Sequence, residues 1–272
     1  MIPFDLATER YFALLEQLQQ AVIVTDTSGR VLHWSDSASA MYGWSASEAE
    51  QRNVLDLTPS SQSRAVADEI MTALREGHVW SGAFDVRSRD GRSFTAYVTD
   101  VPLMDDGEVA VGIVGASATT LGAVPVSTVL LRFAKACDAI WPKRVRLDVE
   151  RAPRGFVAGA EPHVLQLLAL LTIRYADALE RDAVLDVFVS ETIGSAFADF
   201  DVDRMASAVY IRITERHARP KYSLLRDEVR SAHPTNFAAS LVRMIEGALL
   251  VEATPQNQII HLLLPVKAEG RQ

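Results

Sequence analysis

The sequence predicts an α+β protein of two domains, because two stretches with different orders of strands and helices follow one another along its 272 residues. The first stretch runs as two strands, several helices and three strands, and the second alternates helices with strands. Hydrophobic residues make up 49% of the chain and charged residues 23%, which excludes a disordered or fibrous protein. We expect an N-terminal helix over 1–19, a first domain over 20–118, a linker over 119–127 and a second domain over 128–267.

The first half begins with an apolar stripe at helical spacing, carried by Phe12, Leu14, Leu15 and Leu18, which predicts a helix to about Gln19. Turn residues and alternating apolar residues then divide the chain into short elements. The predicted elements are a hairpin of strands 21–26 and 31–34, helices over 37–42, 47–52 and 64–75, and strands over 80–87, 94–103 and 109–116. This order favours an antiparallel sheet with helices packed on it.

The residues of this half resemble a PAS sensory domain over about 8–118. The resemblance rests on Val24-Thr25-Asp26 with Gly29, Trp34, Gly43-Trp44-Ser45 with Glu48, Trp80-Ser81-Gly82, Arg89-Asp90-Gly91, Pro102, Asp106-Gly107 and Gly112-Ile113-Val114-Gly115. It implies a five-stranded antiparallel sheet with helices. Two positions differ from the usual family pattern: Ser35 stands where Asn is common, and 116–120 replaces an Asp-Ile-Thr motif.

The second half predicts an α/β sandwich. Its expected elements are helix 129–141, strand 145–149, a long helix Pro162–Leu179, strands 184–190 and 208–214, helix 236–246, and strands 249–252 and 258–264. Their order, with Val164–Leu168 opening the long helix and Leu241–Gly247 before the last hairpin, resembles the ATP-binding domain of sensor histidine kinases. The resemblance covers about 126–267.

The residues that this resemblance requires for catalysis are absent from the sequence. The family holds Mg²⁺ with an Asn on the long helix, but the chain has three asparagines, Asn53, Asn236 and Asn257, and none falls there. The glycines that would contact adenine and phosphate are missing as well. None of the histidines is followed by the Glu and Pro pattern that marks the phosphoacceptor site of that family. The interval 118–127 is also too short for the helical hairpin that carries a phosphoacceptor His. We expect a domain that has lost nucleotide binding.

Aromatic and flexible side chains are concentrated in the first half and allow two interpretations. They can be its core, or they can enclose a small apolar or planar ligand. The candidate pocket residues are Trp34, Met41, Trp44, Ile70, Met71, Phe84 and Tyr97. A flavin–thiol photosensor needs a cysteine here, but the single cysteine is Cys137, and the helix 64–75 lacks a His for haem. No cofactor and no metal site are therefore predicted.

Charge separates the two halves. Through Ala116 there are 17 acidic residues against 8 arginines and no lysine, a net charge of −9, whereas the remainder has a net charge of +1. The overall charge of −8 gives no basic face for nucleic acid, so we do not expect nucleic-acid binding. A local basic stretch that includes Arg216, Arg219, Lys221 and Arg226 is either a solvated loop or a docking patch for an acidic partner.

The sequence therefore predicts a non-catalytic signalling protein, in which a PAS sensor controls a pseudokinase domain. With no signal peptide and no membrane-spanning run, a cytoplasmic location is expected. The N-terminal helix could bury its stripe against a second copy, giving a homodimer. By resemblance, the partners would be a response regulator or a histidine kinase. The alternatives are a divergent but active ATP-binding sensor kinase and a sequestering regulator like the anti-sigma factors.

Overall fold

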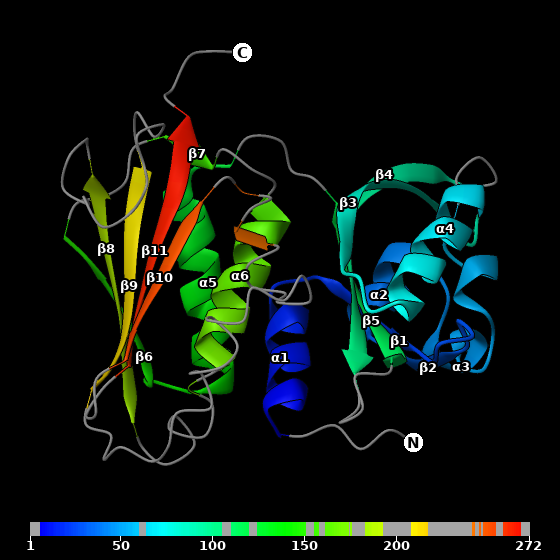
Figure 1. The fold of residues 1–272 in the computed structure, drawn as a ribbon, viewed down its shortest axis with the longest axis horizontal. Helices are drawn as coiled ribbons and strands as arrows, with labels where there is room; N and C mark the ends of the chain where they lie inside the picture. Colours follow the sequence, from blue (N-terminus) through cyan, green and yellow to red (C-terminus); the bar gives the residue numbers. More distant parts are fainter. Residues whose placement is uncertain are drawn as a thin grey trace. The chain divides into compact units, whose positions relative to one another are not determined.

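The computed structural model of the protein describes residues 6–59, 64–104, 110–119, 124–150, 155–157, 161–173, 175, 183–192, 208–216, 241–242, 245, 247–253 and 258–267. Two compact units are present (Figure 1). One is formed by Leu15–Thr120, and the other by Leu121–Gln272 together with the helical residues up to Leu14.

The first unit is a five-stranded antiparallel sheet with helices packed on it, as predicted. Its strands are β1 (Ala21–Thr25), β2 (Val31–Trp34), β3 (Trp80–Arg87), β4 (Ser93–Met104) and β5 (Ala110–Thr119), in the spatial order β2-β1-β5-β4-β3. Helix α1 (Leu6–Gln17) precedes β1, and the helices between strands are α2 (Asp36–Tyr42), α3 (Ala46–Ala49), the 3-10 helix η1 (Val54–Asp56) and α4 (Arg64–Arg75). The first and last strands along the chain are therefore neighbours at the centre of the sheet.

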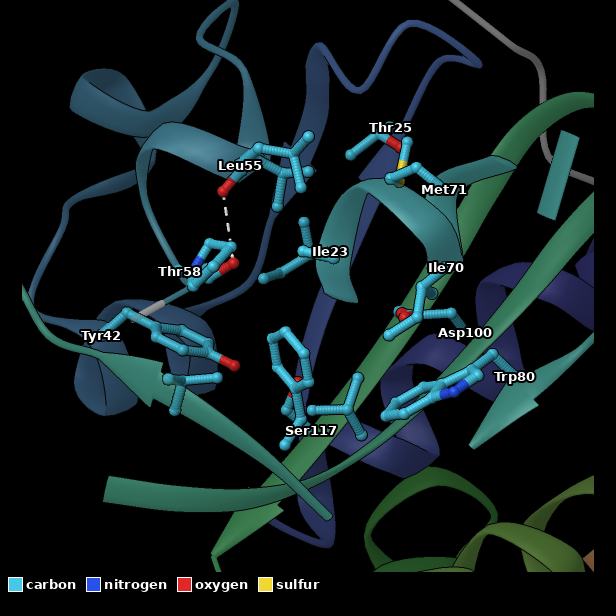
Figure 2. A pocket seen from close by; sticks show the side chains of 17 residues that line it. Ile23, Thr25, Tyr42, Leu55, Thr58, Ile70, Met71, Trp80, Asp100 and Ser117 are labelled. Carbon is cyan, nitrogen blue, oxygen red and sulfur yellow. Dashed lines mark hydrogen bonds between the residues drawn. The ribbon is translucent and has the colours of Figure 1, made fainter. Parts of the chain in front are cut away.

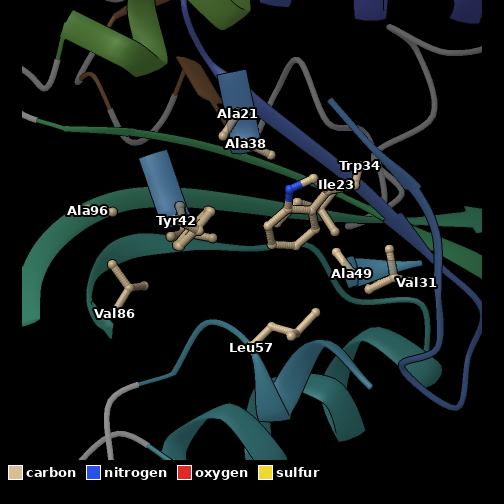
Figure 3. Packing of buried hydrophobic residues seen from close by; sticks show 11 residues of the cluster. Ala21, Ile23, Val31, Trp34, Ala38, Tyr42, Ala49, Leu57, Val86 and Ala96 are labelled. Carbon is tan, nitrogen blue, oxygen red and sulfur yellow. The ribbon is translucent and has the colours of Figure 1, made fainter. Parts of the chain in front are cut away.

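The core of this unit lies where α2 crosses the sheet (Figure 3). Tyr42, the last residue of α2, is 1% exposed, and its ring centroid lies 5.6 Å from that of Trp34 and 6.2 Å from that of Phe94. Trp34 donates its indole N–H to the carbonyl oxygen of Trp44 at 3.0 Å. These aromatic contacts fix α2 on the sheet, and thereby the direction of the Tyr42 side chain.

Ser35 connects β1 to the start of α2. Its side-chain oxygen accepts hydrogen bonds from the backbone N–H groups of Val22 at 3.0 Å and Ala38 at 3.1 Å. One hydroxyl thus caps the helix and satisfies a buried donor of the central strand. The position where the family commonly has Asn is filled here by a shorter side chain that still makes two hydrogen bonds.

The second unit is a mixed sheet with two helices on one of its faces (Figure 1). Its strands are β6 (Val145–Val149), β7 (Phe156–Val157), β8 (Val184–Thr192), β9 (Ala208–Arg216), β10 (Ala248–Ala253) and β11 (Gln258–Lys267), and its helices are α5 (Val126–Ile140) and α6 (Glu161–Ile173). The order is β10-β11-β9-β8-β6, with β7 paired to β11. Among the described strands, β6 and β8 form a parallel pair, and α6 lies in the connection between them.

Alternation along the strands explains which face of this sheet is buried. Leu185, Val187 and Val189 of β8 are fully buried, while the intervening residues are partly exposed. Helix α6 has no polar face: all its residues except Leu170 are buried. An ion pair between Arg132 of α5 and Glu161 joins the two helices. The mixed sheet agrees with the predicted sandwich, whereas most of the predicted helix over 236–246 lies outside the described residues.

Several residues of the apolar stripe predicted for the N-terminal helix are buried. Leu14 and Leu15 are fully buried and Leu18 is 2% exposed. A homodimer through this helix stays a prediction. Among the described residues, no helix is both long enough and apolar enough to span a bilayer.

Candidate functional site

A cavity of about 80 Å³ lies in the first unit, between its sheet and the helices packed on it (Figure 2). Strands β1, β3, β4 and β5 provide one side, and α2, η1 and α4 provide the other. The walls are mostly apolar. The largest apolar side chains that line the cavity are Ile23, Leu55, Ile70, Met71, Trp80 and Phe84.

A single carboxyl group enters this apolar space from the middle of the sheet. The strand register aligns Ile23, Gly115, Asp100 and Trp80 in one row across β1, β5, β4 and β3. Asp100 lies beside Gly115, and a Cβ atom placed on Gly115 would come within 2.7 Å of the Asp100 Oδ1 atom. The absence of a side chain at Gly115 therefore makes room for the carboxyl group over the sheet.

Four hydroxyl groups, those of Thr25, Tyr42, Thr58 and Ser117, line the cavity together with this carboxyl group. The Thr25 hydroxyl on β1 is buried and has no hydrogen-bond partner among the described residues. The Tyr42 hydroxyl is hydrogen-bonded to the side chain of Ser117 on β5. The Thr58 hydroxyl donates to the carbonyl oxygen of Val54 at 3.2 Å. Because a buried hydroxyl without a partner loses the hydrogen bonds it had in water, Thr25 is the group most in need of a ligand atom.

Burial dominates the acid–base chemistry of the cavity. It raises the pKa of Asp100 from 3.8 to about 7, because removing the carboxylate from water disfavours its charged form. Burial also raises the pKa of Tyr42, and the nearby charge of Asp100 raises it further, while the hydrogen bond with Ser117 opposes both effects. Asp100 is therefore divided between its neutral and ionised forms near neutral pH, and Tyr42 stays protonated.

Three of the seven candidate pocket residues line this cavity. Ile70 and Met71 reach it from α4, and Phe84 reaches it from β3, where its ring contacts that of Trp80 edge to face at 5.8 Å. Figure 2 shows Ile70 and Trp80 next to Asp100, and Met71 next to Thr25.

The other four candidates lie elsewhere. Trp34 is part of the core beneath α2, and Met41 packs against that core from its edge. Trp44 lies between two guanidinium groups, those of Arg52 and Arg89, at 4.6 and 5.2 Å from its ring centroid. Tyr97 alternates along β4 with Ala96 and Val98, which places it on the opposite face of the sheet. The presence of an aromatic residue in the sequence does not by itself indicate which face of a strand or helix its side chain occupies.

Sequence reasoning missed the polar residues of the cavity. The signal was present, since a period of two along β4 from Ala96 and Val98 places Asp100 on the buried face. The same period along β1 places Thr25 with Ala21 and Ile23. A charged residue at a core position of a strand is the feature that would have indicated the site.

The predicted basic patch lies largely outside the described residues. Arg216 ends β9, where it pairs with Val184 of β8. Arg219, Lys221 and Arg226 fall in a part of the chain that the structure does not describe. The described residues contain no group of three or more His, Cys, Asp or Glu side chains that could hold a metal ion.

Replacing Asp100 by Asn is expected to remove a pH dependence of stability. With a folded pKa of about 7 and an unfolded value of 3.8, the folded protein keeps a proton that the unfolded chain has lost between these pH values. The free energy of unfolding should thus fall as pH rises from 4 to 7, by up to about 4 kcal/mol. Urea denaturation at several pH values measures this. In Asp100→Asn the free energy of unfolding should no longer fall with rising pH, whereas in the control Asp85→Asn, on an exposed part of β3, it should fall as in the original protein. If the free energy falls equally in Asp100→Asn, the pH dependence does not come from Asp100.

Comparison with protein families and structures adds independent information about the first unit. The family model of the PAS fold matches residues 9–116. Comparison with curated proteins gave no match.

Several solved structures resemble the chain. The PAS domain of a Colwellia psychrerythraea protein is 22% identical over 42% of this chain and 96% of its own, with a TM-score of 0.38. The blue-light activated histidine kinase of Erythrobacter litoralis is 14% identical over 91% of this chain and 95% of its own, with a TM-score of 0.46. The PAS domain of the fruit-fly ELK potassium channel is 8% identical over 41% of this chain and 94% of its own, with a TM-score of 0.35.

The family match covers the β2-β1-β5-β4-β3 sheet, the helices packed on it and the cavity between them. The N-terminal part of this chain is a PAS domain.

Proposed function

We propose that this chain is a signal-transduction protein in which a small ligand in the PAS cavity controls the C-terminal sandwich. The observation that carries the proposal is the cavity itself, with an unpartnered Thr25 hydroxyl and the carboxyl group of Asp100 inside apolar walls formed by the described residues. A pocket with apolar walls and a few convergent polar groups is the usual form of a small-molecule site.

The route from ligand to sandwich follows the chain. Gly115 and Ser117 of β5 line the cavity, β5 ends at Thr119, and α5 of the second unit begins at Val126. The two elements are six residues apart in the sequence, and in this proposal a shift of β5 on ligand binding would be transmitted along that connection. A ligand produces such a shift only if its affinity differs between two arrangements of the protein.

The sandwich would act as a degenerate histidine-kinase ATPase-like domain that binds a partner instead of catalysing phosphoryl transfer. The order of its elements supports a relationship to the ATP-binding domain of histidine kinases. The residues of α6, however, argue against binding of a metal–nucleotide complex. No Asn is present on this helix, and all four of its polar side chains, those of Glu161, His163, Gln166 and Thr172, are buried. None of them is accessible for coordinating a hydrated metal–nucleotide complex.

A regulatory protein of a two-component system, either a response regulator or a histidine kinase, is the proposed partner. The basic stretch with Arg216, Arg219, Lys221 and Arg226 would contact an acidic surface of that partner. A homodimer is proposed as the functional unit. Within it, ligand binding would alter how the two sandwiches are presented.

Filling the cavity should mimic ligand binding. Ala67 lines the cavity from α4 and is 5% exposed, so Ala67→Leu would place three additional carbon atoms in the space. We expect amide hydrogen exchange in α5 to change at least about threefold, as measured by mass spectrometry of the full chain. The control is Val66→Leu on the same helix, where the side chain is 46% exposed and no change is expected. Identical exchange in both variants and the original protein would remove the support for control through the cavity.

Nucleotide binding separates the proposed partner-binding domain from an active kinase. Titration of the full chain with ATP and Mg²⁺ in a calorimeter should give a dissociation constant weaker than about 1 mM, because several polar contacts at about 1 to 3 kcal/mol each are missing. Micromolar binding would instead indicate a divergent active ATP-binding protein.

A further inference from the structure

We propose that the PAS cavity selects a small organic cation, a protonated primary amine with an apolar tail of about four carbons, and binds its ammonium group at Asp100. This inference rests on the proposed function and specifies the ligand of the same cavity. It makes Asp100 the residue that determines specificity. Nothing in the fold of the sheet itself requires a carboxyl group at that position.

The charges around the cavity favour a cation. Asp100 is the only lining residue that can carry a charge at neutral pH, and no Arg, Lys or His is among the described residues that line the cavity. Among the described residues, no cationic side chain pairs with the Asp100 carboxylate. The Asp100 side chain is only partly exposed. A carboxylate that is largely removed from water and has no counter-ion is costly, and a bound ammonium group supplies the missing charge. An anionic ligand would add a second negative charge to the same space.

The hydrogen-bonding groups suit an ammonium ion as well. An ammonium group donates three hydrogen bonds and accepts none. The Asp100 carboxylate, whose Oδ1 atom lies over Gly115, offers acceptors for these hydrogen bonds. Trp80 is paired with Asp100 across the strands and presents an aromatic ring, a surface that also attracts cations.

The remaining space limits the size of the ligand. A volume of about 80 Å³ holds about five or six water-sized groups, which corresponds to an ammonium nitrogen with about four or five carbon atoms. Ile70, Met71 and Phe84 would surround the apolar tail. The Tyr42, Ser117 and Thr58 hydroxyls also line the cavity, and each already has a hydrogen-bond partner.

A neutral ligand with a carbonyl group is the competing solution, because protonated Asp100 can donate a hydrogen bond to it. The two ligands require opposite protonation states of Asp100. The pKa of this group is about 7. Tyr42 from α2 is the other titratable group that lines the cavity, and the lining residues from β1, β3, β5, η1 and α4 are uncharged. The direction of the pH dependence therefore distinguishes an ammonium ligand from a carbonyl ligand.

The experiment titrates the full chain with n-butylamine, 1-butanol and butyrate, which share a four-carbon tail and differ in charge. Binding is followed by the chemical shifts of the Gly115 amide and the Trp80 indole N–H. We expect n-butylamine to bind at least about tenfold more tightly than 1-butanol at pH 8.5. Its affinity should fall about 30-fold between pH 8.5 and 5.5, as Asp100 becomes protonated.

One variant tests the assigned residue. Asp100→Asn keeps the shape of the side chain and should reduce amine affinity at least about tenfold, with little effect on 1-butanol. Amine affinity that is unchanged in Asp100→Asn, or equal for all three ligands, or rising toward low pH, would overturn the inference.

The outcomes also separate this inference from the function on which it rests. If 1-butanol shifts the cavity resonances as strongly as n-butylamine, the cavity still binds ligands and only its selectivity for cations is refuted. If the amine binds as expected but the hydrogen exchange of α5 does not respond to Ala67→Leu, the selectivity stands and the control of the sandwich fails.

Discussion

The position of the Asp100 carboxyl group over Gly115 is the constraint on which the rest of the site depends. A charged group at the centre of a sheet is tolerated only if it is hydrated, neutralised by a proton or paired with a cation. Here Gly115 on the neighbouring strand has no side chain, which leaves room for the carboxyl group of Asp100. The surrounding apolar residues then raise the pKa of Asp100 to about 7, which places proton and cation in competition for the same carboxylate near neutral pH.

The position of Asp100 also links the charge of a bound ligand to neighbouring elements of the backbone. Asp100 and Gly115 are partners in the β4–β5 ladder, and Ser117 of β5 holds the Tyr42 hydroxyl of α2. A ligand that changes the charge of Asp100 thus acts on three elements at once. Because β5 is the last strand of the PAS domain, its position is also the one most directly linked along the chain to α5. In this account, sensing and output depend on one strand.

The sequence predicted the fold of the PAS domain well because its patterns are local. The boundaries of α4, β2 and β3 follow from turn residues and alternation, and the structure has them where they were expected. The site was predicted less well. Aromatic content identified Phe84 but also Trp34, Met41, Trp44 and Tyr97, whose positions depend on how α2 packs and on which face of β4 points inward. The approach of Asp100 to Gly115 depends on pairing between β4 and β5, which a single sequence does not specify without the register.

For the second unit, the sequence predicted the elements better than it predicted the function. Its strands and helices were predicted from periodicity, and the short strand β7 was missed because two residues carry no period. Its role was inferred from residues that a family requires and this chain lacks. Missing residues of this kind can indicate that a domain has lost nucleotide binding, but they do not indicate which partner it binds. The sensor half, where polar groups are present in an apolar cavity, therefore provides the firmer basis for the functional account.

The ionisation of Asp100 is the most direct test of that account. A carbon-13 NMR titration of the Asp100 carboxyl carbon in the full chain, without ligand and with saturating n-butylamine, measures the pKa in both states. The account predicts about 7 for the free protein and a decrease of at least about one pKa unit with the amine, since a bound cation favours the carboxylate. A free pKa near 3.8, or a value that the amine leaves unchanged, would contradict it.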